Sequence, residues 1–291
     1  MFPGFEQQMI PTSGTEIHLR IGGAGPPVLL IHGYPQTHVT WHKVAPTLAR
    51  HFTVVLPDLR GYGDSAAPEP DAQHLTYSKQ AMAQDLVEVM TALGYERFCL
   101  AGHDRGGRVA YRLALDHRGR VQRLAVLDMV PTLDTAERID LGRALSGYHW
   151  FFLAQPAPLP ETLIGGAPDF YLRHTLQSWA GRPQAITPEA MAEYLRCFQS
   201  PTMIRATCED YRAGLSVDLA HDRADREAGK RIHCPVLALW GAERAKSYNP
   251  VEIWRRWADD VQGVPFDCGH FIMEEAPEET AQALRRFFKA T

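Results

Sequence analysis

An aspartate in a glycine-rich turn is the residue of this sequence best placed to do chemistry. Residues 102–108 read Gly-His-Asp-Arg-Gly-Gly-Arg, after a short apolar run and before a helical pattern. Such a strand-to-helix turn is typical of a nucleophile elbow, where glycines let the chain bend tightly and present the central side chain. That side chain is Asp104. A carboxylate attacks an electrophilic carbon without prior deprotonation, so the expected product is an ester of Asp104.

Hydrolysis of that ester requires a base, and His270 is the candidate. The chain holds 13 histidines, so residue type alone selects none of them. His270 stands in the Cys-Gly-His-Phe run over 268–271, after the last strand pattern and before the final helical pattern. An imidazole titrates near neutral pH, which suits it to activate water. We therefore predict that His270 is the general base.

The base needs an acid to orient it, and two residues compete for this role. Asp128 directly ends the apolar run 124–127, the strand pattern that follows the elbow. Glu243 follows the strand pattern 236–240 but lies in an Ala-Glu-Arg-Ala-Lys loop, where a solvated charge is the simpler explanation. The sequence favours Asp128 and leaves Glu243 open.

Two backbone amides are expected to form an oxyanion hole for the second step. Residues 31–35 read Ile-His-Gly-Tyr-Pro and follow an apolar strand pattern. The N–H groups of Tyr34 and Arg105 would then point at the developing negative charge. A second glycine-rich turn, at 58–65, lacks the Lys-Ser/Thr ending of a phosphate-binding loop, and we interpret it as structural.

The elements that must position these residues alternate between strand and helix patterns. Most strand patterns are short and apolar on both faces, which is typical of a parallel sheet covered by helices. The fold class is therefore predicted to be α/β, with a mostly parallel, doubly wound sheet. Thr76 is expected to cap the first helix, and Gly94 to end it. The predicted strands are 16–21, 28–31, 53–56, 97–101, 124–127, 236–240 and 261–266, and the helices lie near 76–93, 106–117, 250–259 and 277–289.

The alternation breaks once, in a segment rich in aromatic residues and prolines. No convincing apolar strand is found between about residues 131 and 225. We interpret this segment as short helices that form a lid over the carboxyl edge of the sheet, where ligands of such folds bind. The predicted division is a core of residues 1–131 and 226–291 and a helical lid of 132–225.

Together these residues resemble the α/β-hydrolase fold across almost the whole chain. An aspartate elbow narrows the resemblance to dehalogenases and epoxide hydrolases, which commonly place Trp after the nucleophile. This chain has Arg105 there and Arg108 three residues on, which resembles the fluoroacetate (haloacetate) dehalogenases. In that family the acid also follows the strand after the elbow, which supports Asp128. Three residues apart on one helical turn, the two guanidinium groups can share a face and bind one carboxylate.

The lid carries a second set of matches to the same family. His149 and Trp150 begin it, and Tyr211 lies near its end. The resemblance implies that these three side chains form a halide pocket and that the two arginines hold the substrate carboxylate. An imidazole N–H, an indole N–H and a phenol O–H are donors that can replace water around a departing fluoride.

The implied activity is hydrolysis of a haloacetate to glycolate and halide, with no cofactor and no metal. The alternative within the enzymes is an epoxide hydrolase that uses the same aspartate and lid tyrosines (Tyr148, Tyr194 and Tyr211), although Arg105 in place of Trp speaks against it. Outside the enzymes, a hydrolase-like receptor or scaffold would have no need of a nucleophile, a base and two candidate acids. The preferred halogen and acid chain length stay open.

The composition agrees with a small-molecule enzyme. The chain has 291 residues, 45% of them hydrophobic, with 30 Lys and Arg against 34 Asp and Glu. A net charge of −4 gives no general attraction to nucleic acid or to anionic membranes. The five cysteines are scattered and include no C-x-x-C pair, which favours a reducing cytoplasm. We expect no signal peptide, no membrane span and no nucleic-acid partner, and the resemblance implies a homodimer.

Overall fold

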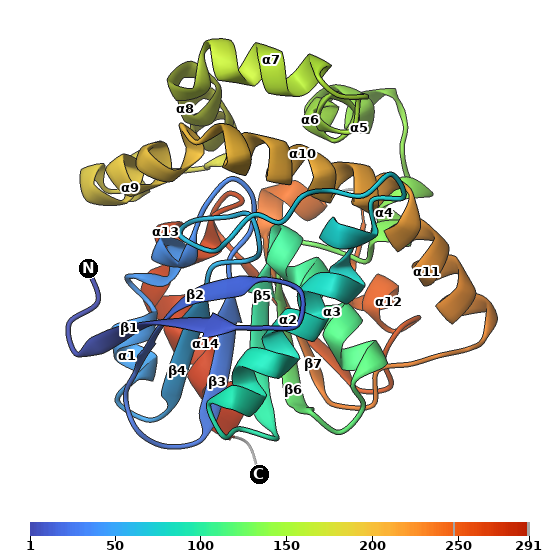
Figure 1. Ribbon diagram of the computed structural model, residues 1–291. Coiled ribbons are helices and arrows are strands. Elements are labelled where there is room, and N and C mark those ends of the chain that lie inside the picture. Colours follow the sequence, from blue (N-terminus) through green and yellow to red (C-terminus); the bar gives the residue numbers. More distant parts are fainter. Residues whose placement is uncertain (247, 290–291) are drawn as a thin grey trace.

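The computed structural model of the protein, which describes residues 1–246 and 248–289, is built on one eight-stranded sheet in the order β1-β2-β4-β3-β5-β6-β7-β8 (Figure 1). Every neighbouring pair from β4 to β8 is parallel, whereas β2 is antiparallel to both of its neighbours. The predicted α/β class with a mostly parallel sheet is confirmed. The strands are β1 (Phe5–Pro11), β2 (Glu16–Gly22), β3 (Pro27–Ile31), β4 (Thr53–Pro57), β5 (Phe98–His103), β6 (Val121–Leu127), β7 (Val236–Gly241) and β8 (Val261–Phe266).

The edge strand β1 is absent from the sequence-based expectation. Its residues read Phe-Glu-Gln-Gln-Met-Ile-Pro, and none of them is fully buried. It pairs with β2 from Phe5 opposite Gly22 to Pro11 opposite Glu16. An edge strand exposes one of its sides to water, so it lacks the apolar run by which the central strands are recognised.

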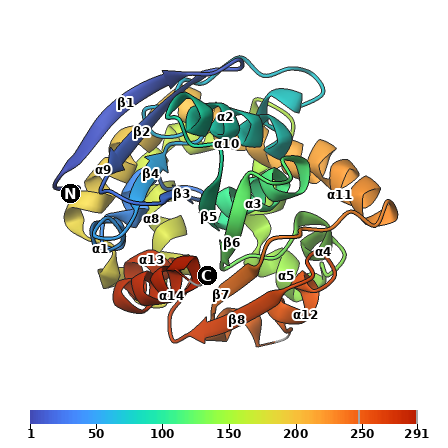
Figure 2. The ribbon, with the colours of Figure 1, turned by 90° about the horizontal axis from the view of Figure 1, so that it is seen from below.

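Helices cover both faces of the sheet, with α2 and α3 on one face and α1 and α14 on the other (Figure 2). The predicted cap at Thr76 is wrong, because α2 begins after Ser78, whose side chain accepts a hydrogen bond from the Ala81 N–H at 3.2 Å. The Thr76 N–H and hydroxyl instead donate to Asp71. Gly94 follows α2 with φ +83°, as expected for a helix end. These core helices are α1 (Ala45–Leu48), α2 (Lys79–Ala92), α3 (Asp104–Asp116), α12 (Pro250–Trp254), α13 (Ile272–Glu275) and α14 (Pro277–Lys289).

The segment between β6 and β7 consists of short helices joined by loops. The structure describes every residue of 128–235 and places no strand there. Figure 1 shows α5 to α10 stacked across one end of the sheet, while α11 descends beside it. The helices are α4 (Thr132–Ala136), α5 (Leu141–Ser146), α6 (Tyr148–Leu153), α7 (Leu159–Gly166), α8 (Pro168–Trp179), α9 (Pro188–Phe198), α10 (Pro201–Leu215) and α11 (Val217–Glu227). Among the described residues, no helix has both the length and the apolar character needed to span a bilayer.

Candidate active site

The chain turns sharply from β5 into α3 at Asp104. Asp104 has φ +46°, a left-handed conformation that residues other than glycine rarely adopt, so the turn stores backbone strain. Glycines make this turn sterically accessible. A Cβ on Gly102 would lie 2.4 Å from the carbonyl oxygen of Gly106, and one on Gly106 would lie 2.1 Å from that of His32. The local sequence therefore fixes the direction in which the Asp104 carboxylate leaves the chain.

The Asp104 carboxylate is almost buried, at 8% exposure, yet it is charged. Burial alone would raise its pKa, but His270, Arg108 and Arg105 lie close enough to hold the pKa below its ordinary value. Its Oδ2 accepts a hydrogen bond from the backbone N–H of Tyr34 at 3.1 Å. An ionised carboxylate in this position is ready to act as a nucleophile.

Of the two amides expected at the oxyanion hole, that of Tyr34 contacts this carboxylate. The Tyr34 N–H already points at it, and would face the carbonyl oxygen of any ester formed there. The Arg105 N–H belongs to the first turn of α3, where backbone amides have no acceptor within the helix.

His270 and Asp128 are hydrogen-bonded to each other. The His270 Nδ1 lies 2.6 Å from Asp128 Oδ2, so this nitrogen donates its proton and Nε2 is left to accept one. The other oxygen, Asp128 Oδ1, accepts from the Gly241 N–H at 3.0 Å. Asp128 itself has φ +49° directly after β6. Both side chains line the same cavity as Asp104.

Glu243, the rival acid, lies in a solvated turn after β7. Its side chain is 70% exposed and forms an ion pair with Lys246, three residues on. A carboxylate in water with a partner on its own turn has no reason to orient a buried imidazole. The geometry therefore favours Asp128 over Glu243.

We expect Asp128→Asn to slow turnover by roughly 10²- to 10⁴-fold, because an amide neither fixes the same tautomer of His270 nor stabilises its charged form. The matched change Glu243→Gln should leave turnover within about twofold, as is usual for an exposed pair. Steady-state product release from both purified variants checks this. Loss of activity in Glu243→Gln alone would transfer the acid role to that residue.

The two arginines that look equivalent in sequence have different partners. The Arg105 Nε and Nη2 donate to the Asp210 carboxylate at 3.0 and 2.7 Å, and Nη2 also donates to the Asp210 carbonyl at 2.6 Å. Tyr62 donates to the same carboxylate at 2.8 Å, and Lys79 forms an ion pair with it. The charge of Arg105 is thus balanced, and its buried Nη1 is the nitrogen left without a partner.

Arg108 meets only neutral acceptors. Its Nη1 donates to the Val130 carbonyl at 3.1 Å and to the Thr132 hydroxyl at 3.0 Å, and Nη2 lies 3.4 Å from the Thr135 hydroxyl. No carboxylate among the described residues forms an ion pair with it. Burial, and then the charge of Arg105, lower its pKa. Arg108 therefore brings to the wall of the cavity a positive charge that no carboxylate of the described residues hydrogen-bonds, and Asp104 in the same cavity acts on it only through space.

His149, Trp150 and Tyr211 are brought together beside these arginines. The Tyr211 ring lies 5.7 Å from each of the other two, centroid to centroid. The Arg105 guanidinium carbon lies 4.2 Å from the Tyr211 ring centroid, and that of Arg108 lies 4.5 Å from the Trp150 ring centroid. Tyr211 is fully buried, and its hydroxyl has no hydrogen-bond partner among the described residues. A buried phenol in this state can donate to a ligand.

The cavity beside Asp104 has a volume of about 540 Å³, and its lining includes neither Arg105 nor Tyr211, which lie behind it. Trp179 also lines this cavity, a position that is not predicted from the sequence. Its ring centroid lies 4.3 Å from that of His149 and 5.4 Å from that of His270. Trp179 is one of many aromatic residues in the lid, and nothing in its local sequence separates it from the others. The lining includes Asp104, Arg108, Asp128, His149, Trp150, Trp179 and His270.

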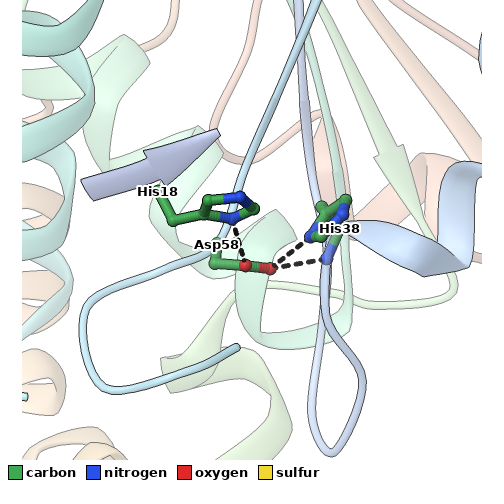
Figure 3. A group of neighbouring side chains, drawn as sticks. All are labelled: His18, His38 and Asp58. Atoms are coloured by element: carbon green, nitrogen blue, oxygen red, sulfur yellow. Dashed lines mark hydrogen bonds and ion pairs between the residues drawn. The ribbon is translucent and has the colours of Figure 1, made fainter. Parts of the chain in front are cut away.

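A second cluster, outside the cavity, has side chains of the types that ligate metals. His18, His38 and Asp58 are buried, with their ligand atoms within 4.8 Å of one another. Figure 3 shows both rings turned toward the carboxylate, with the Nδ1 atoms of His18 and His38 at 2.8 and 2.9 Å. The Asp58 carboxylate also accepts hydrogen bonds from the backbone N–H groups of His38 and Asp64. These contacts make Asp58 a hydrogen-bonded anchor for the turn 58–65. The Nδ1 atoms of both imidazoles point at its carboxylate.

The chain is similar to known proteins along almost its whole length. A family model described as alpha/beta hydrolase fold matches residues 26–277. The chain is 42% identical to a fluoroacetate dehalogenase from Burkholderia sp, over 99% of this chain and 95% of the relative. It is 35% identical to a soluble epoxide hydrolase from Corynebacterium sp. (strain C12), over 95% and 94%. Among solved structures, ALR0039 from Nostoc sp PCC 7120, described as an alpha/beta hydrolase, matches with a TM-score of 0.98 and 53% identity over 100% of both chains.

Proposed function

The chain belongs to the α/β-hydrolase family, and within this family we propose that it is a hydrolytic dehalogenase that converts haloacetates to glycolate and halide. One observation carries the proposal. The ionised Asp104 shares its cavity with Arg108, whose charge has no carboxylate partner among the described residues. A nucleophile beside a guanidinium group that has no hydrogen-bonded anion suits a small substrate that has both an electrophilic carbon and a carboxylate.

In the first step an Asp104 oxygen attacks the carbon that bears the halogen. A carbon–oxygen bond forms, the carbon–halogen bond breaks, and the halide leaves with the bonding electrons. The guanidinium groups of Arg105 and Arg108 hold the substrate carboxylate, and the N–H and O–H donors of His149, Trp150 and Tyr211 receive the halide. The enzyme is then an ester of Asp104.

In the second step His270 Nε2 takes a proton from water, and the resulting hydroxide attacks the carbonyl carbon of the ester. The Asp128 carboxylate stabilises the imidazolium that forms. The Tyr34 N–H, with the amide of Arg105, stabilises the negative charge on the carbonyl oxygen. Collapse of this intermediate breaks the bond to the glycolate oxygen, which takes the proton from His270, and Asp104 returns to a carboxylate by releasing the second proton of the water to solvent.

Epoxide hydrolysis is the second candidate, because a relative at 35% identity carries that name and the nucleophile would be the same. It needs lid tyrosines that donate to the epoxide oxygen. Of the three tyrosines considered, Tyr194 donates to Glu274 at 2.5 Å and Tyr148 is 42% exposed, which leaves Tyr211. An epoxide also has no carboxylate to use the charge of Arg108, so the dehalogenase is favoured.

The test compares two products from the same enzyme preparation. Fluoro-, chloro- and bromoacetate are incubated with the protein and the halide is measured by ion chromatography, while styrene oxide is incubated in parallel and its diol is measured by liquid chromatography. We expect halide and no enzymatic diol. Diol without halide would support the epoxide hydrolase, and neither product would point to a ligand-binding protein.

Arg108→Ala should damage turnover of chloroacetate far more than turnover of neutral chloroacetamide. Leaving a buried carboxylate without one partner costs roughly 2–5 kcal/mol, a loss of at least about 30-fold in kcat/KM. The amide substrate has no charge to lose. The measurement is halide release from both substrates by one enzyme preparation. Equal losses would show that Arg108 serves folding and not recognition.

Three expectations from the sequence remain predictions. They are the homodimer implied by the resemblance, the cytoplasmic location, and the absence of nucleic-acid and membrane partners inferred from the net charge. Sedimentation of the purified protein tests the first of these.

A further inference from the structure

The carboxylate of Glu275 binds three backbone amides around the proposed base. Its Oε2 accepts from the Gly269 N–H at 2.9 Å, and its Oε1 accepts from the Phe271 N–H at 3.1 Å. These two residues flank His270 on either side. The third donor is the Arg182 N–H, at 2.8 Å from Oε2, which comes from the lid. Glu275 is only 6% exposed, so water cannot easily take its place.

The remaining backbone groups of His270 are also held from outside its own loop. The His270 N–H donates to the carbonyl of Trp179 at 3.1 Å, and its carbonyl accepts from His103 Nε2 at 2.8 Å. Burial lowers the pKa of His103 to about 3, so this ring is neutral and donates through Nε2. The peptide units around the base are thus fixed by side chains and by the lid.

The lid segment 179–182 packs directly on this loop. A Cβ on Gly269 would lie 2.0 Å from the backbone nitrogen of Gly181, so only a glycine allows the two chains to approach so closely. The Arg182 side chain also reaches Asp267, with Nη2 2.8 Å from its carbonyl oxygen and 3.0 Å from its Oδ2. The Asp267 carboxylate is exposed to solvent, whereas that of Glu275 is buried where the two segments meet.

We propose that Glu275 is a positioning residue, which holds the His270 loop against the lid segment 179–182 and so aims the imidazole at the ester of Asp104. This inference rests on the proposed function, because it assigns Glu275 to the second chemical step. The first step is displacement by a carboxylate and does not use His270. A change at Glu275 should therefore slow ester hydrolysis selectively.

Glu275→Gln is the appropriate variant, because it keeps the size of the side chain and removes half of its acceptors. An amide has one oxygen, and its NH₂ group must then face a backbone N–H that it cannot accept. The loop shifts to relieve this conflict. Misplacement of a catalytic group by about 1 Å costs up to about 10²-fold, so we expect ester hydrolysis to slow by about 10- to 100-fold.

The experiment measures the ester itself. Wild type and variants are mixed with excess chloroacetate, quenched during turnover, and analysed by intact-protein mass spectrometry for the added mass of one carboxymethyl group. The folded fraction is first isolated by size exclusion. We expect the ester to be a minor species in wild type and the main species in Glu275→Gln, with halide release lowered at steady state.

The neighbouring residue provides a matched control. Glu274 lies on the same short helix and is as buried, but its carboxylate accepts from Tyr194 at 2.5 Å and from Gln36 at 3.1 Å. Within the described part of the chain, neither of these side-chain hydrogen bonds goes to the His270 loop. Glu274→Gln makes the same chemical change at the adjacent residue. We expect this variant to accumulate no more ester than wild type.

The outcomes separate this inference from the proposed function. If His270→Asn accumulates ester and Glu275→Gln does not, or if Glu274→Gln accumulates as much as Glu275→Gln, the positioning role is wrong. If no variant forms ester, the proposed function itself fails. Loss of stability alone lowers the folded fraction but leaves the ester level of each folded molecule unchanged. Should Glu275→Gln fail to fold, Glu275→Ala, in which water can reach the three amides, is measured in the same way.

Discussion

Halide release should disappear when Asp104 is replaced by alanine, because the other carboxylates in the lining are engaged: Asp128 is hydrogen-bonded to His270, and Asp140 caps α5. We expect a loss on the order of 10⁶-fold, the size seen when a covalent nucleophile is removed from a hydrolase. Asp104→Asn should lose activity comparably, since an amide keeps the shape of the side chain but is a poor nucleophile. Ion chromatography of halide from chloroacetate measures both variants.

Isotope labelling locates the reaction at Asp104. During a single turnover in H₂¹⁸O, water attacks the carbonyl carbon of the ester, so the label should enter the Asp104 carboxylate and the first glycolate should carry unlabelled oxygen from it. Peptide mass spectrometry over 102–108 measures the incorporation. Label found in glycolate during that first turnover would mean that water attacks the substrate directly, and the ester mechanism would be discarded.

The central part of the fold could be predicted because its strands are buried on both faces. A run such as 98–101 is apolar at every position, and the sheet encloses it completely. The edge strand β1 gives no such signal, since its pairing with β2 depends on tertiary structure and not on its own residues. The helix start at Ser78 was missed for a related reason, because Thr76 and Ser78 are both plausible caps and Asp71 decides between them by binding Thr76.

The candidate site divides in the same way. Asp104, Asp128 and His270 follow strand ends, and the carboxyl ends of parallel strands meet at one edge, so local sequence was enough to group them. The unequal partners of Arg105 and Arg108 could not be predicted, because Asp210 lies 105 residues from Arg105 in the chain. Trp179 reaches the site only through the packing of the lid on the core, which leaves no local signature. Glu275 is close to His270 in the chain, but its contact with the Arg182 N–H depends on the same packing.

Replacing His270 with asparagine should stop the second step and leave the first intact. Displacement of the halide needs only the Asp104 carboxylate, whereas attack by water on the ester needs a base within hydrogen-bond reach. We expect one equivalent of halide to be released per enzyme molecule, followed by turnover slower by on the order of 10²–10⁴-fold. Intact-protein mass spectrometry should find the carboxymethyl ester on almost every molecule.

The residue that carries this ester shows whether Asp104 and His270 act in successive steps of one reaction. The ester should map to Asp104, and the double variant Asp104→Ala, His270→Asn should form none, because the acceptor of the carboxymethyl group is gone. Asp128→Asn should accumulate the same ester to a smaller extent, since His270 would still be present but without the partner at 2.6 Å that fixes its tautomer. An inactive His270→Asn that carries no ester would show that the imidazole also serves the displacement, and the division of labour between Asp104 and His270 would have to be abandoned.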